Sequence, residues 1–189
     1  MATQTKPDRL YFTDDAAANE LIARDPLALL IGFALDQQVS VQTAFTGPAK
    51  LKQRLGSLDA RKIAATDPAQ LEAIFREKPA IHRFPGSMAE RVQALARHVL
   101  DEYDGDAERL WSQAADGAEL RRRIAALPGF GDMKIRSLSA VLAKRYGVPA
   151  AQEIAPSHPT LGDVDSAESL ADYQAKKRAY KAEQRAKRG

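Results

Sequence analysis

Two glycines, a lysine and an arginine within residues 129–136 have the types and spacing of a phosphate-binding turn. Residues 118–147 read AELRRRIAALPGFGDMKIRSLSAVLAKRYG, which predicts a helix, a tight hairpin and a second helix. Gly129 and Gly131 permit positive φ angles, which glycine adopts without strain. The first turn of the second helix then offers free backbone N–H groups to an anion, beside Lys134 and Arg136. The segment therefore predicts binding to the phosphate backbone of a duplex without sequence preference; the alternative is an ordinary helix end followed by a turn.

The elements that position this hairpin are predicted to be helices throughout, so the predicted fold class is all-α. Val, Ile and Thr are sparse and no apolar alternation is sustained, which disfavours strands. Ser87 is expected to cap a long amphipathic helix that ends at Tyr103, and Gly47-Pro48 to interrupt an earlier helix. Further helix starts are expected at Asp14 or Asp15, Asp25, Ser40, Asp59, Asp67 and Asp165.

Composition excludes several kinds of chemistry. The 189-residue chain has no cysteine, which rules out disulfides, thiolate catalysis and iron–sulfur clusters. With only three scattered histidines, we expect no metal site and no cofactor. The longest apolar stretch, Pro26–Leu35, is too short to span a membrane, and the N-terminus has no secretory pattern; we expect a cytoplasmic protein, associated with the nucleoid when bound to DNA.

Positive charge gathers at the C-terminus. Residues 172–189 contain seven basic and two acidic residues and so carry +5, which leaves −2 on the rest of a chain whose total is +3. A basic tail suits an anionic partner such as nucleic acid. A solvated helix end is the alternative interpretation.

The hairpin and two further segments together resemble a known family. LPGFG followed by a basic helix looks like the helix-hairpin-helix of the HhH-GPD superfamily of base-excision DNA glycosylases. ALDQQVSVQTAF, at 34–45, resembles a segment of the 3-methyladenine-glycosylase branch, and HRFPGSMAERVQALARHV, at 82–99, resembles the helix before the hairpin. The resemblance covers about residues 25–170 and implies an endonuclease-III-like, two-lobed helical fold without the iron–sulfur cluster, with the hairpin at the lobe boundary beside a cleft.

The resemblance implies a place for the target base and for the gap it leaves in the duplex. A residue at the position of Gln38 would fill the gap, with Gln37 beside it; a simple helix-end turn is the alternative. Tyr11, Phe12 and Phe84 lie in polar segments and could stack on an extruded base, with Phe84 the best placed, although loop packing is an alternative. Ser87, with the N–H groups that follow it, could form a second phosphate contact.

Chemistry at the sugar requires a carboxylate near the oxocarbenium-like transition state. The resemblance assigns this role to Asp165, with Asp163 as its rival. Asp165 also reads as a helix N-cap, with Glu168 completing a capping box, and it follows Gly131 by 34 positions, more than is usual in the family. Met133 occupies the position of the lysine that serves as nucleophile in bifunctional members, which implies a glycosylase without AP-lyase activity.

We expect one helical domain over residues 14–182, an N-terminal arm over 1–13 and a basic tail over 183–189. The expected function is DNA repair by a monofunctional DNA glycosylase that acts as a monomer on double-stranded DNA and hydrolyses the N-glycosidic bond of a damaged base, for which an alkylated base is the candidate. Two other classes of function remain open: a DNA-binding relative without catalysis, and a helical protein-interaction domain whose hairpin is only structural.

Overall fold

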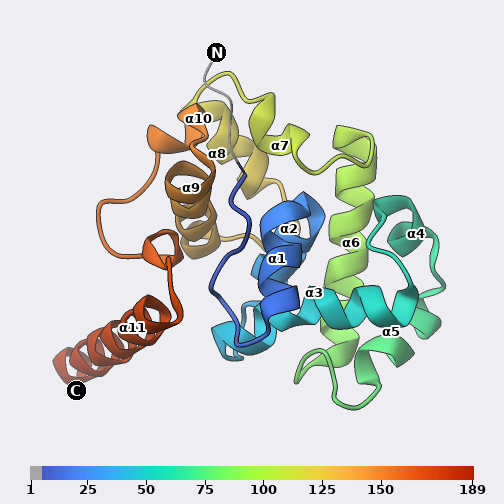
Figure 1. Cartoon of the computed structure of the whole chain (residues 1–189), viewed down its shortest axis with the longest axis horizontal. Helices are drawn as coiled ribbons and strands as arrows, with labels where there is room; N and C mark the ends of the chain where they lie inside the picture. Colours follow the sequence, from blue (N-terminus) through green and yellow to red (C-terminus); the bar gives the residue numbers. More distant parts are fainter. Residues whose placement is uncertain (1–5) are drawn as a thin grey trace.

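A computed structural model describes residues 6–189, so residues 1–5 of the expected N-terminal arm lie outside the described part of the chain. Within it every regular element is a helix (Figure 1), which confirms the all-α prediction. The elements are α1 Ala16–Arg24, α2 Pro26–Leu35, α3 Val41–Leu55, α4 Ala60–Ala65, α5 Pro68–Arg76, α6 Pro85–Tyr103, α7 Arg109–Ser112, α8 Gly117–Ala125, α9 Asp132–Tyr146, α10 Pro149–Gln152, the 3₁₀ turn η1 Leu161–Asp163 and α11 Ala167–Arg188.

Short polar side chains begin most of the early helices, as the sequence predicts. Asp25 accepts hydrogen bonds from the backbone N–H groups of Leu27 and Ala28, at 3.0 and 3.2 Å, and Pro26 follows it in the first turn. These side chains satisfy N–H groups that have no partner within the helix. The same arrangement begins α1, α3, α4 and α5, at Asp15, Ser40, Asp59 and Asp67.

Two expected helix boundaries are wrong. Pro48 does not interrupt its helix, because α3 continues from Val41 to Leu55. Gly47 and Pro48 are both buried, and a Cβ atom at Gly47 would lie 2.5 Å from Leu35 Cδ1. Close packing against α2 thus outweighs the hydrogen bond that proline removes. Ser87 is not a cap either: α6 begins two residues earlier, at Pro85, which is favoured in a first turn.

The apolar helix α2 is the centre of the core. Every residue from Leu27 to Leu35 is buried, which a helix that is hydrophobic all round requires. α2 contacts α1, α3 and α6, and a Cβ atom at Gly32 would lie 2.3 Å from Phe45 Cδ1 on α3. Within residues 6–189 no helix is both long and apolar enough to cross a membrane.

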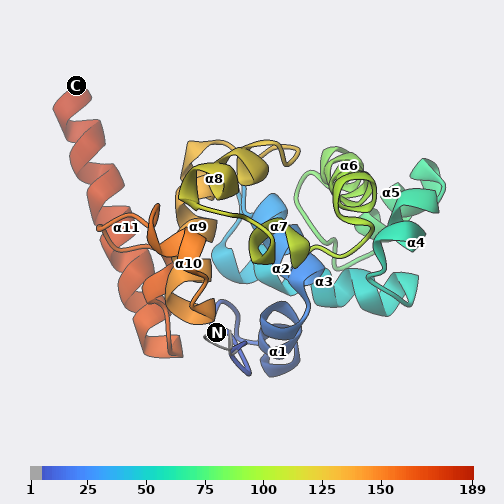
Figure 2. The ribbon, with the colours of Figure 1, turned by 90° about the horizontal axis from the view of Figure 1, so that it is seen from above.

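The other helices form two groups on either side of α2 (Figure 2). Helices α4, α5 and α6 pack together on one side, and α8, α9, α10 and η1 pack together on the other. The carboxyl end of α2 and the loop that follows it contact both groups, through Arg91 of α6 and Lys134 of α9.

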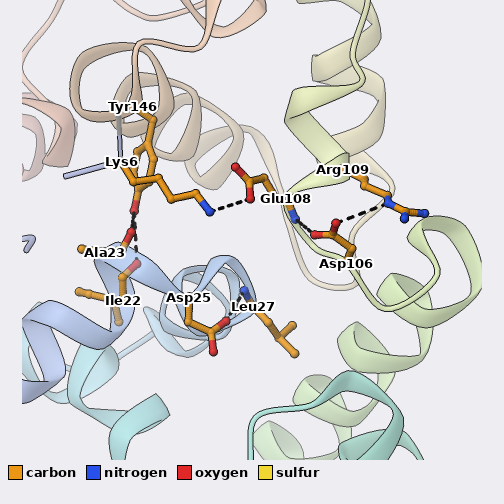
Figure 3. A network of polar contacts seen from close by, with 9 residues as sticks. All are labelled: Lys6, Ile22, Ala23, Asp25, Leu27, Asp106, Glu108, Arg109 and Tyr146. Carbon is orange, nitrogen blue, oxygen red and sulfur yellow. Dashed lines mark hydrogen bonds and ion pairs between the residues drawn. The ribbon is translucent and has the colours of Figure 1, made fainter. Parts of the chain in front are cut away.

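Polar contacts join the N-terminal part of the chain to the segment before α7 and to the end of α9 (Figure 3). Lys6 Nζ lies 2.7 Å from a carboxylate oxygen of Glu108, just before α7. The Tyr146 hydroxyl, at the end of α9, donates to the backbone oxygen of Ala23 at 2.8 Å. Burial raises the pKa of Tyr146, so this phenol keeps the proton that the hydrogen bond needs. This hydrogen bond holds α9 against α1.

Candidate functional site

The hairpin between α8 and α9 is a compact turn with buried anchors. Leu127 and Phe130 are buried, and the Phe130 N–H donates to the Leu127 oxygen at 3.2 Å. Of the two glycines that permit positive φ, Gly129 adopts it, with φ +78°. Gly131 does not: its φ is −90° and it is the N-cap of α9, with open space where a Cβ atom would stand. A single left-handed residue is enough to reverse the chain here.

The first turn of α9 has the features of an anion site. No side chain caps this helix, so the N–H groups of its first turn have no side-chain acceptor. The carboxylate of Asp132 is paired with Arg121 at 3.2 Å, which offsets a negative charge that would repel phosphate. Arg136 is exposed, and so is Met133, with 74% of its surface accessible. Backbone donors and an exposed guanidinium are therefore available to a phosphate group.

Arg91 joins the hairpin to the loop after α2. Its guanidinium donates to the side-chain oxygen of Gln37, and a Cβ atom at Gly129 would lie 2.7 Å from its Nε. Gln38, the next residue, is exposed and has φ +58°, an uncommon conformation for a residue other than glycine. The structure thus brings Gln37 and the hairpin together and leaves the Gln38 side chain at the surface.

Lys134 does not point to solvent as a phosphate ligand would. Its Nζ donates to the backbone oxygen of Ala34 at 3.2 Å and lies 5.6 Å from the centre of the Phe130 ring. Burial and the charge of Arg91 lower the pKa of Lys134 to about 8, although the charge of Asp36 acts in the opposite direction. The ammonium group is therefore directed at the carboxyl end of α2, where the helix dipole is negative.

Asp36 ends α2 beside this lysine. Burial raises the pKa of Asp36, and the nearby charges of Lys177, Lys134 and Lys181 act to lower it. The pKa of Tyr173 on α11 is raised, chiefly by burial and to a smaller extent by the charge of Asp36. A shielded carboxyl group, a lysine from the hairpin helix and residues of α11 thus meet at the end of α2.

His82 connects the loop that contains Phe84 to the carboxyl end of α2. Its Nε2 lies 3.1 Å from the Leu35 oxygen and 3.0 Å from the Gln37 oxygen, and its Nδ1 accepts from the Phe84 N–H at 3.0 Å. His82 is buried, and its hydrogen bonds hold the Phe84 loop against the end of α2. Phe84 is 40% exposed, with Arg83 5.0 Å above its ring. An exposed aromatic ring therefore lies on the loop tied to Gln37.

The structure does not place Asp165 and Asp163 in this cluster. Asp163 pairs with Lys144, in the last turn of α9. Burial acts to raise the pKa of Asp163, but the hydrogen bonds from Lys144 and from the Thr160 N–H hold it below its ordinary value. Asp165 is exposed.

The expected cap at Asp165 is wrong as well. Ser166 is the N-cap of α11, and the third residue of its capping box is Ser169, not Glu168. The Asp165 N–H also donates to Ser169 Oγ, at 2.9 Å. Serine at both positions of the box leaves the carboxylates of Asp165 and Glu168 free in solvent.

The remaining predicted contacts lie in different surroundings. Phe12 is fully buried, against Phe45 at 4.9 Å between ring centres, so its predicted stacking on a base is wrong. Tyr11 is half-buried and packs against the core, in the segment hydrogen-bonded to α1 through Leu10 and Asn19. Ser87 is exposed in the first turn of α6, where free N–H groups lie beside it.

The sequence reasoning missed Arg91 and Asp36. Asp36 directly precedes the glutamine pair, and Arg91 lies on the helix after HRFPGS, so both occur within segments that were singled out. No local pattern marks either residue as part of a site, because each becomes relevant only through contacts far along the chain.

Comparison with protein families gives one match and two negative results. Residues 31–185 match the model of the family described as HhH-GPD superfamily base excision DNA repair protein. No curated protein and no solved structure matches the chain. The matched range contains both glutamines, the α6 helix, the hairpin and most of α11.

Proposed function

Because the chain belongs to the HhH-GPD superfamily of base excision DNA repair proteins, we propose that it binds double-stranded DNA and hydrolyses the N-glycosidic bond of a damaged base. The observation that carries the proposal is the contact of the hairpin with the glutamine loop through Arg91. A base-excision enzyme must hold the backbone and fill the gap left by the extruded base at one place. The uncapped α9 turn suits the first task and the exposed Gln38 the second.

The base itself would lie near the loop of Phe84. Its ring is exposed, and the His82 hydrogen bonds hold its backbone against the Gln37 loop. A flipped base gains by stacking on such a ring. The similarity of residues 34–45 to the 3-methyladenine-glycosylase branch favours an alkylated base as substrate.

Two carboxyl groups compete for the role at the sugar. The resemblance assigns it to Asp165, which is exposed before α11. Asp36 is the second candidate, because it ends α2 and burial raises the pKa of its carboxyl group. A carboxylate in a shielded site stabilises developing positive charge more strongly than one in water.

The proposed enzyme leaves the abasic strand uncut and acts as a monomer. Met133 cannot form an imine with the sugar. Lys134, although its pKa is lowered to about 8, is hydrogen-bonded to Ala34 and lies against Phe130, so it does not project from the hairpin toward a duplex.

Abasic-site formation on lesion-bearing duplexes tests the proposal. The wild-type chain is incubated with a panel that includes 3-methyladenine, 7-methylguanine and hypoxanthine, and the strand is cleaved with alkali afterwards. We expect excision to fall about a hundredfold or more in the variant that lacks the working carboxylate. Asp165→Asn, its rival Asp163→Asn and Asp36→Asn are compared, with Asp172→Asn, on the exposed surface of α11, as the control. Strand cleavage without alkali, or a borohydride-trapped adduct, would contradict the monofunctional assignment.

A second candidate function is DNA binding without catalysis. The exposure of Asp165 and Met133 favours it. This function would be established if duplex binding is retained while no lesion in the panel is excised.

A further inference from the structure

The C-terminal helix α11 is unusual in this molecule because it is long and hardly packed. It has 22 residues, and among them only Leu170 is buried. Figures 1 and 2 show it projecting beyond the other helices, with the C-terminus at its free end, and in Figure 2 that end lies on the side of α8. A polar helix that is not packed gains little stability from burial. The arrangement of charged side chains on its surface is therefore the feature that can indicate a role.

One face of α11 begins as a packing face. Leu170 is buried, Tyr173 packs against the core, and the side chains of Gln174 and Gln42 are hydrogen-bonded at 2.7 Å. Residues three and four positions apart share a face of a helix. The continuation of this face is therefore occupied by Lys177, Lys181, Arg185 and Arg188, which we call the inner ridge.

The inner ridge contains only basic charges, whereas the opposite face is mixed. Glu168, Asp172 and Glu183 lie on that opposite face together with Lys176 and Lys187, and Lys187 is paired with Glu183 at 2.7 Å. Like charges four residues apart destabilise a helix by about 0.2–0.5 kcal/mol per pair. The basic residues of the inner ridge therefore repel one another, whereas those of the opposite face have acidic neighbours.

The inner ridge begins at the candidate site. Lys177 and Lys181 lie close enough to Asp36 for their charges to act on its carboxyl group. From Lys177 to Arg188 the ridge extends about 16 Å, at about 1.5 Å per residue. This length matches about five phosphates of one DNA strand, which are spaced about 3.4 Å apart along the axis.

We propose that the inner ridge of α11 is a second DNA-backbone contact, which binds the phosphates of a duplex that the hairpin holds at the end of α2. The inference rests on the proposed DNA binding and adds a part of the chain to it. The occupant is a polyanion because the ridge has four cations and no acid, and it is duplex DNA because the ridge is continuous with the cluster formed by Asp36, Lys134 and the hairpin. Since the body without residues 172–189 carries −2, the ridge supplies the positive field that draws in DNA.

Salt dependence of duplex binding tests this proposal with two charge-matched variants. Lys181→Gln/Arg185→Gln removes two charges from the inner ridge, and Lys176→Gln/Lys187→Gln removes two from the opposite face. An undamaged 25-base-pair duplex is titrated from 50 to 200 mM salt. We expect the inner variant to reduce the magnitude of the negative slope of log K against log[salt] by about 1.8, since each phosphate contact contributes about 0.9. The outer variant should reduce this magnitude by less than about 0.5.

The outcomes separate this proposal from the proposed function. Wild-type binding with equal slopes in both variants would overturn the inner ridge as a DNA contact while leaving the hairpin function intact. Absence of duplex binding by the wild-type chain would overturn the proposed function itself. Vesicles of phosphatidylserine and phosphatidylcholine are titrated in parallel: binding lost in the inner variant alone, with unchanged duplex slopes, would assign the ridge to a membrane surface instead. Circular dichroism of both variants checks that α11 remains helical.

Discussion

Arg91 and Gln37 are 54 positions apart in the chain, and the guanidinium of the first donates a hydrogen bond to the side-chain oxygen of the second. The same guanidinium lies against Gly129, at the turn of the hairpin. One side chain of α6 therefore holds the loop after α2 and the α8–α9 hairpin in a fixed relation. The two parts proposed to contact DNA are coupled through it.

We expect Arg91 and Gln37 to show energetic coupling. Arg91→Ala and Gln37→Ala, made singly and together, form a double-mutant cycle. Because the residues are in direct contact, their effects on the free energy of unfolding should be non-additive by about 0.5–3 kcal/mol. Urea unfolding measures the cycle. Additive effects would show that the hydrogen bond does not join the two loops.

Substitution of Gly129 should harm the hairpin more than substitution of Gly131. Gly129→Ala imposes a positive φ on an L-residue and places a Cβ atom 2.7 Å from Arg91 Nε, at an expected cost of about 1–3 kcal/mol. Gly131→Ala has φ −90° and open space, so it should cost less than about 1 kcal/mol. Thermal unfolding and duplex titration compare the two variants. Equal loss in both would mean that backbone conformation at 129 does not determine the site.

Removal of the buried amine at Lys134 should stabilise the protein near neutral pH. The folded pKa of Lys134, about 8, lies below the unfolded value of about 10.4. The unfolded chain therefore binds more protons between these values, and wild-type stability rises with pH across that window. Because the ammonium is partly solvated, Lys134→Met should gain only about 1 kcal/mol at pH 7.

This gain should shrink as the pH is raised from 8 to 10. Urea unfolding at several pH values measures it, and Lys176→Met, on the exposed surface of α11, is the control that should show no such window. A gain for Lys134→Met that is independent of pH would contradict the lowered pKa.

Acid should weaken the loop that His82 holds. Burial lowers the pKa of His82, and the protonated ring cannot accept the Phe84 N–H at Nδ1. The unfolded chain therefore binds the proton more readily, so stability is lost as the pH falls below about 6.5, the unfolded value.

His82→Gln should remove this part of the pH dependence and lower the stability at pH 7.5 by about 1–3 kcal/mol, the cost of unsatisfied buried groups. Unfolding by urea at pH 7.5 and pH 5 measures both effects. His158→Gln, at an exposed position, should retain the wild-type pH dependence. If both variants behave alike, His82 is not the group that responds to acid.

The sequence by itself determined most of the helices, the caps at Asp15, Asp25, Ser40, Asp59 and Asp67 and the hairpin at Gly129, because caps, breakers and apolar spacing act over a few residues. The caps predicted at Ser87 and Asp165 are not formed. The sequence also located the glutamine loop and the hairpin as the two parts to consider. Where local rules compete with packing they failed: Pro48 stays within α3 because Gly47 is pressed against Leu35.

Tertiary structure alone decided which way the charged side chains point. Lys134 lies one position from an exposed methionine, yet it turns inward, where the Ala34 oxygen, a hundred positions earlier, accepts a hydrogen bond from its ammonium group. Asp36, at the end of α2, feels the charges of Lys134 from α9 and of Lys177 and Lys181 from α11. Contacts between residues so distant in the chain depend on how the helices pack, and no periodicity in one segment contains that information.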